Sequence, residues 1–136
     1  MLLFKDNRMN DISIYFQAVK DSDSWQGQQL GAYITKNLSD FPELEKNSCA
    51  LFYVPEFRGS GAENKSVASK FREAFYTLHH EQDWKSPIYD LGDILPGNTL
   101  EDTYFAVSKV VAELVKNQII PIIIGGSQDL TVAMYT

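Results

Sequence analysis

The chain has 136 residues, of which 44% are hydrophobic and 12% aromatic, a composition that predicts one folded domain rather than a disordered segment. Its formal net charge is -6, and an acidic surface repels phosphate backbones and anionic lipids, which argues against nucleic-acid and membrane partners. No apolar run approaches the roughly 20 residues that span a bilayer, and the amino terminus lacks the apolar core of a signal peptide. With Cys49 as the single cysteine, no intrachain disulfide can form, and a cytoplasmic location is expected.

Residues 1–48 are predicted to form an N-terminal extension that packs on the domain after it. Within this extension, residues 12–16 fit either a short strand or an irregular apolar anchor. Asp23 and Ser24 offer a helix cap, and apolar residues then recur at helical spacing. We therefore expect a helix that ends before Pro42, because proline disfavours helical geometry in the residue before it.

Residues 49–136 are predicted to form the N-terminal, incomplete part of an α/β domain. Apolar runs predict strands over residues 49–54, 87–93 and 119–124. Helical patterns lie between the strands, and this alternation is typical of an open parallel sheet with right-handed crossovers.

Two helices are expected between these strands. The first is predicted from an apolar stripe at helical spacing, formed by Val67, Phe71, Phe75 and Leu78. The second begins at a capping box formed by Thr99 and Asp102 and ends near Asn117, a plausible left-handed stop. Its predicted buried side consists of Tyr104, Val107, Val111, Leu114 and Val115.

The most informative stretch is the third strand and the turn after it. An uninterrupted apolar run is typical of a strand buried on both faces of a sheet. Gly125 and Gly126 then allow a sharp turn or a close approach to a ligand, and the polar residues Ser127, Gln128 and Asp129 follow. Because ligands of open α/β sheets lie just past the carboxyl ends of the strands, the pattern predicts a functional site at this turn.

This stretch resembles the third-strand motif of the arginase, agmatinase and formimidoylglutamase (ureohydrolase) family, an apolar strand that ends in Gly-Gly-Asp-His-Ser. Gly125 and Gly126 match the motif. Ser127 stands at the position of the family's Asp, Gln128 at that of its His, and Asp129 at that of its Ser.

Two further segments are similar to the same family. Residues 89–93, Tyr-Asp-Leu-Gly-Asp, resemble the end of its second strand. Val54 and Pro55, followed by a glycine-bearing loop and the pair Phe71 and Arg72, resemble its first strand, loop and helix. The resemblance implies an arginase-like three-layer open parallel sheet, with the strands side by side in the order two-one-three.

The family resemblance also implies that the chain is truncated after the third strand, because ureohydrolases extend to about two typical domain lengths. Thr136 would fall inside the next helix. The third strand would then lack a neighbour and expose an apolar edge. Self-association into a homo-oligomer is therefore expected.

The activity implied by the resemblance is hydrolysis of a formimino or guanidino C–N bond at a binuclear manganese centre, with formimidoylglutamate as the first candidate substrate. In the family the motif's His ligates manganese, so Gln128 and the adjacent Asp129 are the candidate metal ligands, at a turn formed by Gly125, Gly126 and Ser127. An amide oxygen binds Mn²⁺ less strongly than imidazole does.

The family's later ligand motifs lie beyond residue 136, so we expect this fragment to be inactive. The alternative is a non-catalytic arginase-fold homologue that acts in binding or assembly. At the turn itself, a cap on the following helix by Ser127 or Asp129 is favoured over a metal site, because Ser and Asp are preferred at that position.

Other motifs receive structural interpretations. Residues 59–66 partly match a phosphate-binding loop, but Asn64 stands where a glycine belongs, so a surface loop that caps a helix is favoured. Asp90 and Asp93 could form a carboxylate pair, although Asp residues are common at such turns. Cys49 opens a predicted buried strand and is expected to act as a small hydrophobic residue.

Overall fold

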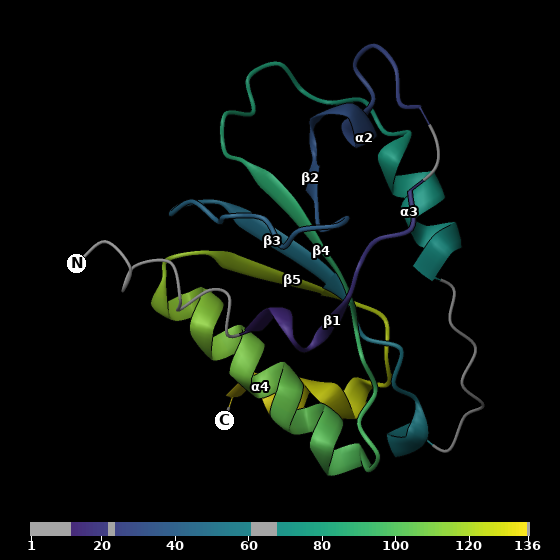
Figure 1. Cartoon of the computed structure of the whole chain (residues 1–136), viewed down its shortest axis with the longest axis vertical. Coiled ribbons are helices and arrows are strands. Elements are labelled where there is room, and N and C mark those ends of the chain that lie inside the picture. The colour runs from purple at the N-terminus through teal and green to yellow at the C-terminus, as the bar shows by residue number, and fades with distance from the viewer. Residues whose placement is uncertain (1–11, 22–23, 61–67, 136) are drawn as a thin grey trace.

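The computed structural model describes residues 12–21, 24–60 and 68–135, without the side chains of Ser60 and Gln128. These residues form a mixed α/β fold around a five-stranded sheet (Figure 1). The strands are β1 (Phe16–Gln17), β2 (Thr35–Lys36), β3 (Cys49–Tyr53), β4 (Ile88–Ile94) and β5 (Ile120–Ile124). The helices are α2 (Leu30–Tyr33), α3 (Ala68–Tyr76) and α4 (Leu100–Lys116), with the 3₁₀ helices η1 (Arg58–Ser60) and η2 (Gln128–Tyr135).

The sheet is mostly parallel and has β3 at its centre. The strand order is β1-β4-β3-β5, with β2 also paired to β4. Cys49 lies opposite Ile88 on one side and Ile120 on the other, and both neighbouring strands run parallel to β3. The predicted order two-one-three is therefore confirmed for β4, β3 and β5. The extension contributes as well, because β1 pairs antiparallel with β4 and β2 pairs parallel with it.

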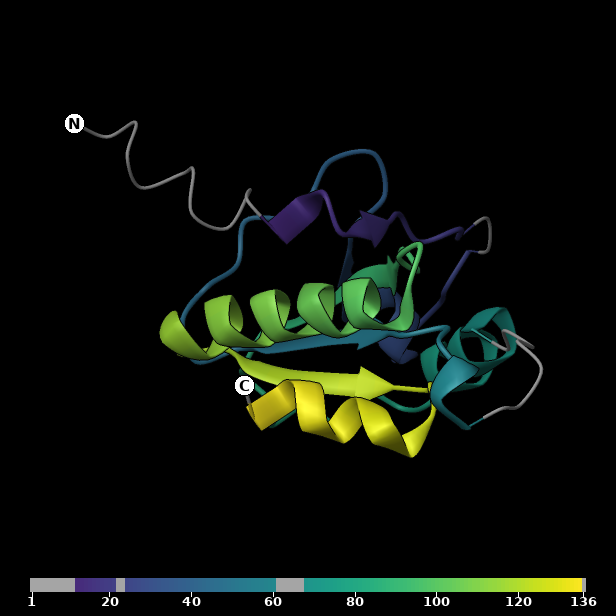
Figure 2. The ribbon, with the colours of Figure 1, turned by 90° about the horizontal axis from the view of Figure 1, so that it is seen from below.

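The main core lies between the sheet and α4, which crosses the sheet (Figure 2). The helix η2 packs against α4 and lies next to β5. Helix α4 begins at the predicted capping box, in which the side chains of Thr99 and Asp102 each accept from the other's backbone N–H. Of its predicted buried side, Val107, Val111 and Leu114 are buried, Tyr104 is half-buried and Val115 is 57% exposed. The helix also buries Thr103, Ala106 and Val110, which were not predicted. The left-handed residue after the helix is Gln118 (φ 63°), one position later than predicted, because Asn117 keeps a negative φ.

The buried stripe of α3 is not the predicted apolar one. Ala68, Arg72 and Tyr76 face the protein, whereas Leu78 lies beyond the helix and is 53% exposed. Phe71 and Phe75 stack on each other with ring centroids 5.3 Å apart. Val67 lies outside the described residues. The prediction was wrong because Asp90 on β4 is fully buried and attracts the polar side of α3.

The predicted helix before Pro42 is almost absent. Asp23 of the predicted cap lies outside the described residues, and between residues 24 and 41 only Leu30–Tyr33 are helical. Strand β2 follows directly after the extended residue Ile34. Gly27 adopts a positive φ of 57°, which an α-helix does not permit. Pairing of β2 with β4 therefore overrides the helical spacing of this segment.

Among the described strands, β5 lies at the edge of the sheet, and the prediction that it is buried on both faces was wrong. Ile120 is 60% exposed and Ile122 41% exposed, while Ile123 packs against the core from the opposite face. The Ile120 N–H donates to Ser48 on the β3 side, so the nitrogen of Pro121 faces away from β3, where its missing N–H breaks no bond in the sheet.

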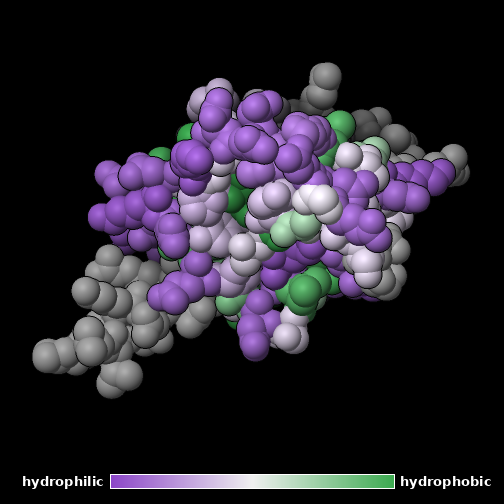
Figure 3. Space-filling view, turned by 90° about the horizontal axis from the view of Figure 1, so that it is seen from above, coloured by the Kyte–Doolittle hydropathy of each residue, from purple (hydrophilic) through white to green (hydrophobic). Residues whose placement is uncertain are grey.

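The surface seen from above in Figure 3 is largely hydrophilic, with small hydrophobic spots. Among the described residues, no helix is both long and apolar enough to cross a membrane.

Candidate functional site

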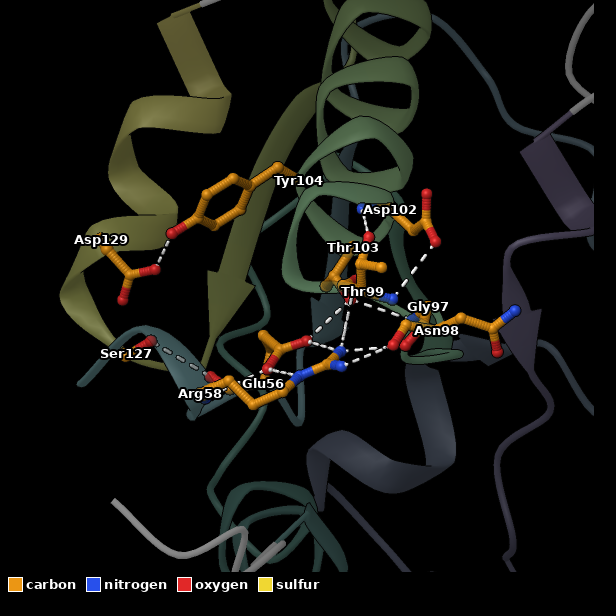
Figure 4. Close-up of polar contacts among 10 residues, drawn as sticks. All are labelled: Glu56, Arg58, Gly97, Asn98, Thr99, Asp102, Thr103, Tyr104, Ser127 and Asp129. Carbon is orange, nitrogen blue, oxygen red and sulfur yellow. Dashed lines mark hydrogen bonds and ion pairs between the residues drawn. The ribbon is translucent and has the colours of Figure 1, made fainter. Parts of the chain in front are cut away.

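The candidate site lies where the carboxyl ends of β3 and β5 meet the start of α4 (Figure 4). Gly125 (φ 79°) and Gly126 (φ 80°) turn the chain after β5 in a conformation that disfavours other residues. A Cβ at Gly125 would lie 2.7 Å from the ring of Tyr53, and one at Gly126 would lie 3.0 Å from the carbonyl oxygen of Val54. Both glycines are therefore required by the close packing of this turn against β3.

Ser127 joins the turn to the end of β3. Its backbone N–H donates to the carbonyl oxygen of Glu56 at 2.9 Å, and its hydroxyl donates to the same oxygen at 3.4 Å. The residues after β3 and β5 are thus held together by hydrogen bonds at the edge where the sequence predicts a site.

Glu56 is the most buried charge of this site, with 2% of its surface exposed. Its carboxylate accepts two bonds from the Arg58 guanidinium, from Nε at 2.8 Å and from Nη2 at 2.6 Å. The hydroxyl of Thr103 donates to it at 2.7 Å. The hydrogen bonds from Arg58, followed by the one from Thr103, overcome the effect of burial and lower the pKa of Glu56 to about 2.

Arg58 also reaches the loop before α4. Its Nη1 donates to the carbonyl oxygen of Asn98 at 3.0 Å, and its Nη2 to that of Gly97 at 2.9 Å and, at 3.4 Å, to that of Thr99. One guanidinium thereby connects the segment after β3 with the segment before α4.

Asp129 lies on the other side of this cluster, in the first turn of η2. Its carboxylate accepts a hydrogen bond from the hydroxyl of Tyr104 on α4 and packs closely on Gly59. Hydrogen bonds from Ser127 and Tyr104 lower the pKa of Asp129, and the bond to this carboxylate raises the pKa of Tyr104 to about 12. The predicted metal ligand is therefore already engaged by a protein donor.

The residues at this edge do not fit a two-manganese centre. Gln128 opens η2 at the position of the family's histidine, and its amide is a weak ligand for such a metal. The neighbouring Asp129 carboxylate is hydrogen-bonded to Tyr104. Across the described part of the chain, no group of three or more His, Cys, Asp and Glu side chains could hold a metal ion.

A second charged cluster lies between α3 and β4. Arg72 donates from Nε and Nη2 to Asp90, at 2.7 and 3.0 Å, and from Nη1 to Asp93 at 2.7 Å. Tyr76 donates to Asp90 as well. Burial opposes the charge of Arg72, but the two carboxylates outweigh it and raise the pKa of the guanidinium. Burial, with the charge of Asp90, also raises the pKa of Tyr76.

The predicted carboxylate pair is thus a pair of acceptors on one guanidinium. The predicted turn is absent, because Asp90 and Asp93 both lie within β4; Asp90 accepts the backbone N–H of Gly92 at 3.0 Å, where Gly92 has a φ of 99° and the pairing with β3 shifts its register. A pocket of about 210 Å³ opens beside the cluster, lined by Lys20, Asp21, Trp25, Ser69, Arg72, Glu73 and Tyr76.

Sequence reasoning missed Glu56, Arg58, Thr103 and Tyr104. The available signal was a glutamate placed directly after an apolar strand and a proline, at the sheet edge where ligands lie.

In the partly matched phosphate loop, Gly59 lies in η1, whereas Asn64 and Lys65 are outside the described residues. Cys49 is buried as predicted, and burial raises the pKa of its thiol.

The fold defines an open, mostly parallel α/β protein with polar clusters at the carboxyl ends of its strands. Comparison with solved structures finds similarity to formimidoylglutamase from Bacillus subtilis subsp. subtilis str. 168, with a TM-score of 0.64 and 16% sequence identity. The match covers 93% of this chain and 42% of that one, so the chain spans less than half the length of that enzyme. Neither the family models nor the curated protein sequences contain a match. The comparison shows a shared arginase-like fold.

Proposed function

We propose that this chain is part of an arginase-fold protein whose carboxyl-end site serves binding or assembly rather than metal-dependent hydrolysis. The observation that carries this proposal is the hydrogen bond from Tyr104 to Asp129, beside the glutamine that replaces the family's histidine. The carboxylate that a metal would need is directed toward a neighbouring helix.

A binuclear metal site requires ligands that are not already engaged by other groups of the protein. Two metal ions need several carboxylates or imidazoles directed at one point, and together they activate a bridging water. Here a second carboxylate of the site, Glu56, is bound by Arg58 and Thr103. Each acidic group of the site is therefore neutralised or hydrogen-bonded within the chain.

The second candidate is a hydrolase of formimino or guanidino C–N bonds, as the fold shared with formimidoylglutamase favours. In this case a homo-oligomeric cytoplasmic enzyme would act on a small-molecule substrate. Gln128 and Asp129 would be the manganese ligands of this half of the site, with Gly125, Gly126 and Ser127 forming the turn beneath the metal.

Calorimetric titration with Mn²⁺ separates the two candidates. The wild-type chain should release no saturable binding heat, whereas a Gln128→His, Tyr104→Phe double variant, which restores an imidazole and frees Asp129, should bind more Mn²⁺ than either single variant. A Leu78→Ser variant, altered at an exposed residue remote from the turn, serves as the control. Saturable binding of Mn²⁺ by the wild type would overturn the proposal and favour the hydrolase.

A further inference from the structure

The pocket beside α3 contains three polar side chains that the described part of the chain does not engage. Lys20, Ser69 and Glu73 line this pocket, are exposed, and have no hydrogen-bonding or ionic partner among the described residues. The ammonium group of Lys20 only donates hydrogen bonds, an ionised Glu73 only accepts them, and the hydroxyl of Ser69 does both. The pocket therefore offers a mixed set of hydrogen-bonding groups to a ligand.

The aromatic walls of the pocket are fixed by contacts within the protein. The indole N–H of Trp25 donates to Asp21 at 3.0 Å, and Asp21 forms an ion pair with Lys36 at 2.9 Å. The ring of Trp25 meets that of Tyr76 edge-on, with centroids 5.3 Å apart. It also packs on Gly31, where a Cβ would lie 2.5 Å from the indole Cγ. The two rings thus form a preorganised apolar surface beside the three unengaged polar groups.

The charges around the pocket argue against an ionic ligand. Arg72 and Asp21 also line the pocket, and each is matched by an opposite charge within the chain. The two charges that remain, on Lys20 and Glu73, have opposite signs, so an ion that is attracted by one is repelled by the other. A neutral ligand with several hydroxyl groups avoids this repulsion, because each hydroxyl both donates and accepts hydrogen bonds.

We propose that this pocket binds a neutral carbohydrate as a single pyranose ring. The C–H groups on one face of the ring lie against Trp25, and its hydroxyl groups bond to Lys20, Ser69 and Glu73. The volume of about 210 Å³ is below the roughly 300 Å³ at which pockets for drug-sized ligands begin, which suits one ring.

A zwitterion such as glycine is the rival ligand, because it carries both charges. It would leave the aromatic surface uncovered and would lose the hydration of two ions, which favours the sugar. None of the lining residues belongs to the turn after β5, and the test requires no metal, so its failure would leave the proposed function untouched.

The test follows the fluorescence of Trp25 in a Trp84→Phe variant, in which it is the sole tryptophan. We expect a saturable change with methyl β-D-glucopyranoside or methyl β-D-galactopyranoside, which are non-reducing sugars and do not react with lysine amines. Glycine, sodium acetate and methylammonium chloride at equal concentrations should give no saturable change. A response to neither glycoside, or tighter binding of any of these three ions than of the glycosides, would overturn the proposal.

Substitutions in the pocket locate the binding site. Lys20→Met and Glu73→Ala should each weaken glycoside binding about tenfold, because each removes a hydrogen bond to a charged group. Lys46→Met, at an exposed lysine that does not line the pocket, should leave the affinity unchanged. Unchanged affinity in both pocket variants would overturn the assignment. If the Trp84→Phe chain does not fold, isothermal titration calorimetry with the natural tryptophans in place measures the same affinities.

Discussion

At the scale of single residues, buried charge fixes the position of α3. Asp90 has no exposed surface and accepts hydrogen bonds from Arg72, Tyr76 and the backbone of Gly92. Asp93 accepts from the same arginine but is 24% exposed. The two aspartates share one partner and differ in burial, so they form a matched pair for measuring what the buried charge contributes.

Asp90→Asn should lower the free energy of unfolding by about 3 kcal/mol, because it removes the charge that compensates the buried Arg72. Asp93→Asn should cost about 1 kcal/mol, since water reaches that carboxylate and the Asp90 contact remains. Urea unfolding at neutral pH measures both values. Equal losses in the two variants would contradict the assignment of Asp90 as the principal partner of Arg72.

At the scale of elements, the turn between β5 and η2 depends on the backbone of its glycines. Gly126 combines a positive φ of 80° with close neighbours, the carbonyl oxygen of Val54 and the side chain of Leu130. Gly27 also has a positive φ, 57°, but a Cβ there would meet nothing within 4 Å. The same substitution at these two positions separates backbone strain from crowding.

Gly27→Ala should cost about 1 kcal/mol of unfolding free energy, from backbone strain alone. Gly126→Ala should cost at least ~1 kcal/mol more, because the new methyl group crowds the end of β3 and displaces η2. Denaturant unfolding of both variants measures these losses. Near-equal losses of unfolding free energy would contradict the prediction, because they would mean that the turn accommodates the added methyl group.

At the scale of the whole molecule, the exposed face of β5 is the feature that most affects behaviour in solution. Ile120 and Ile122 are large apolar side chains that lie beside each other on an edge strand. Among the described residues no strand pairs with the outer side of β5. Apolar edges of this kind favour association with another chain.

We therefore expect the chain to self-associate in a concentration-dependent way, and Ile122→Lys to shift it toward the monomer. Leu78→Lys, a matched change at an exposed apolar residue after α3, should leave the association unchanged. Sedimentation velocity over a range of concentrations measures both. A wild-type chain that stays monomeric at the highest concentration would contradict this prediction.

The sequence by itself determined the central strands and the start of α4. Continuous apolar runs give β3 and β5, and the capping box at Thr99 positions α4, because both signals depend on residues that are neighbours in the chain. The family resemblance supplied the order two-one-three, which the sheet confirms.

Only the tertiary structure decided which faces are buried and which polar groups meet. The stripe of α3 was wrong because the partner of Arg72 is Asp90, 18 positions away on another strand. Arg58 binds carbonyl groups that lie 39 to 41 positions later in the chain, and Glu56 accepts from Thr103, which lies 47 positions later. Long-range partners of this kind leave no periodic pattern in the sequence, because charge pairing acts between residues that only the fold brings together.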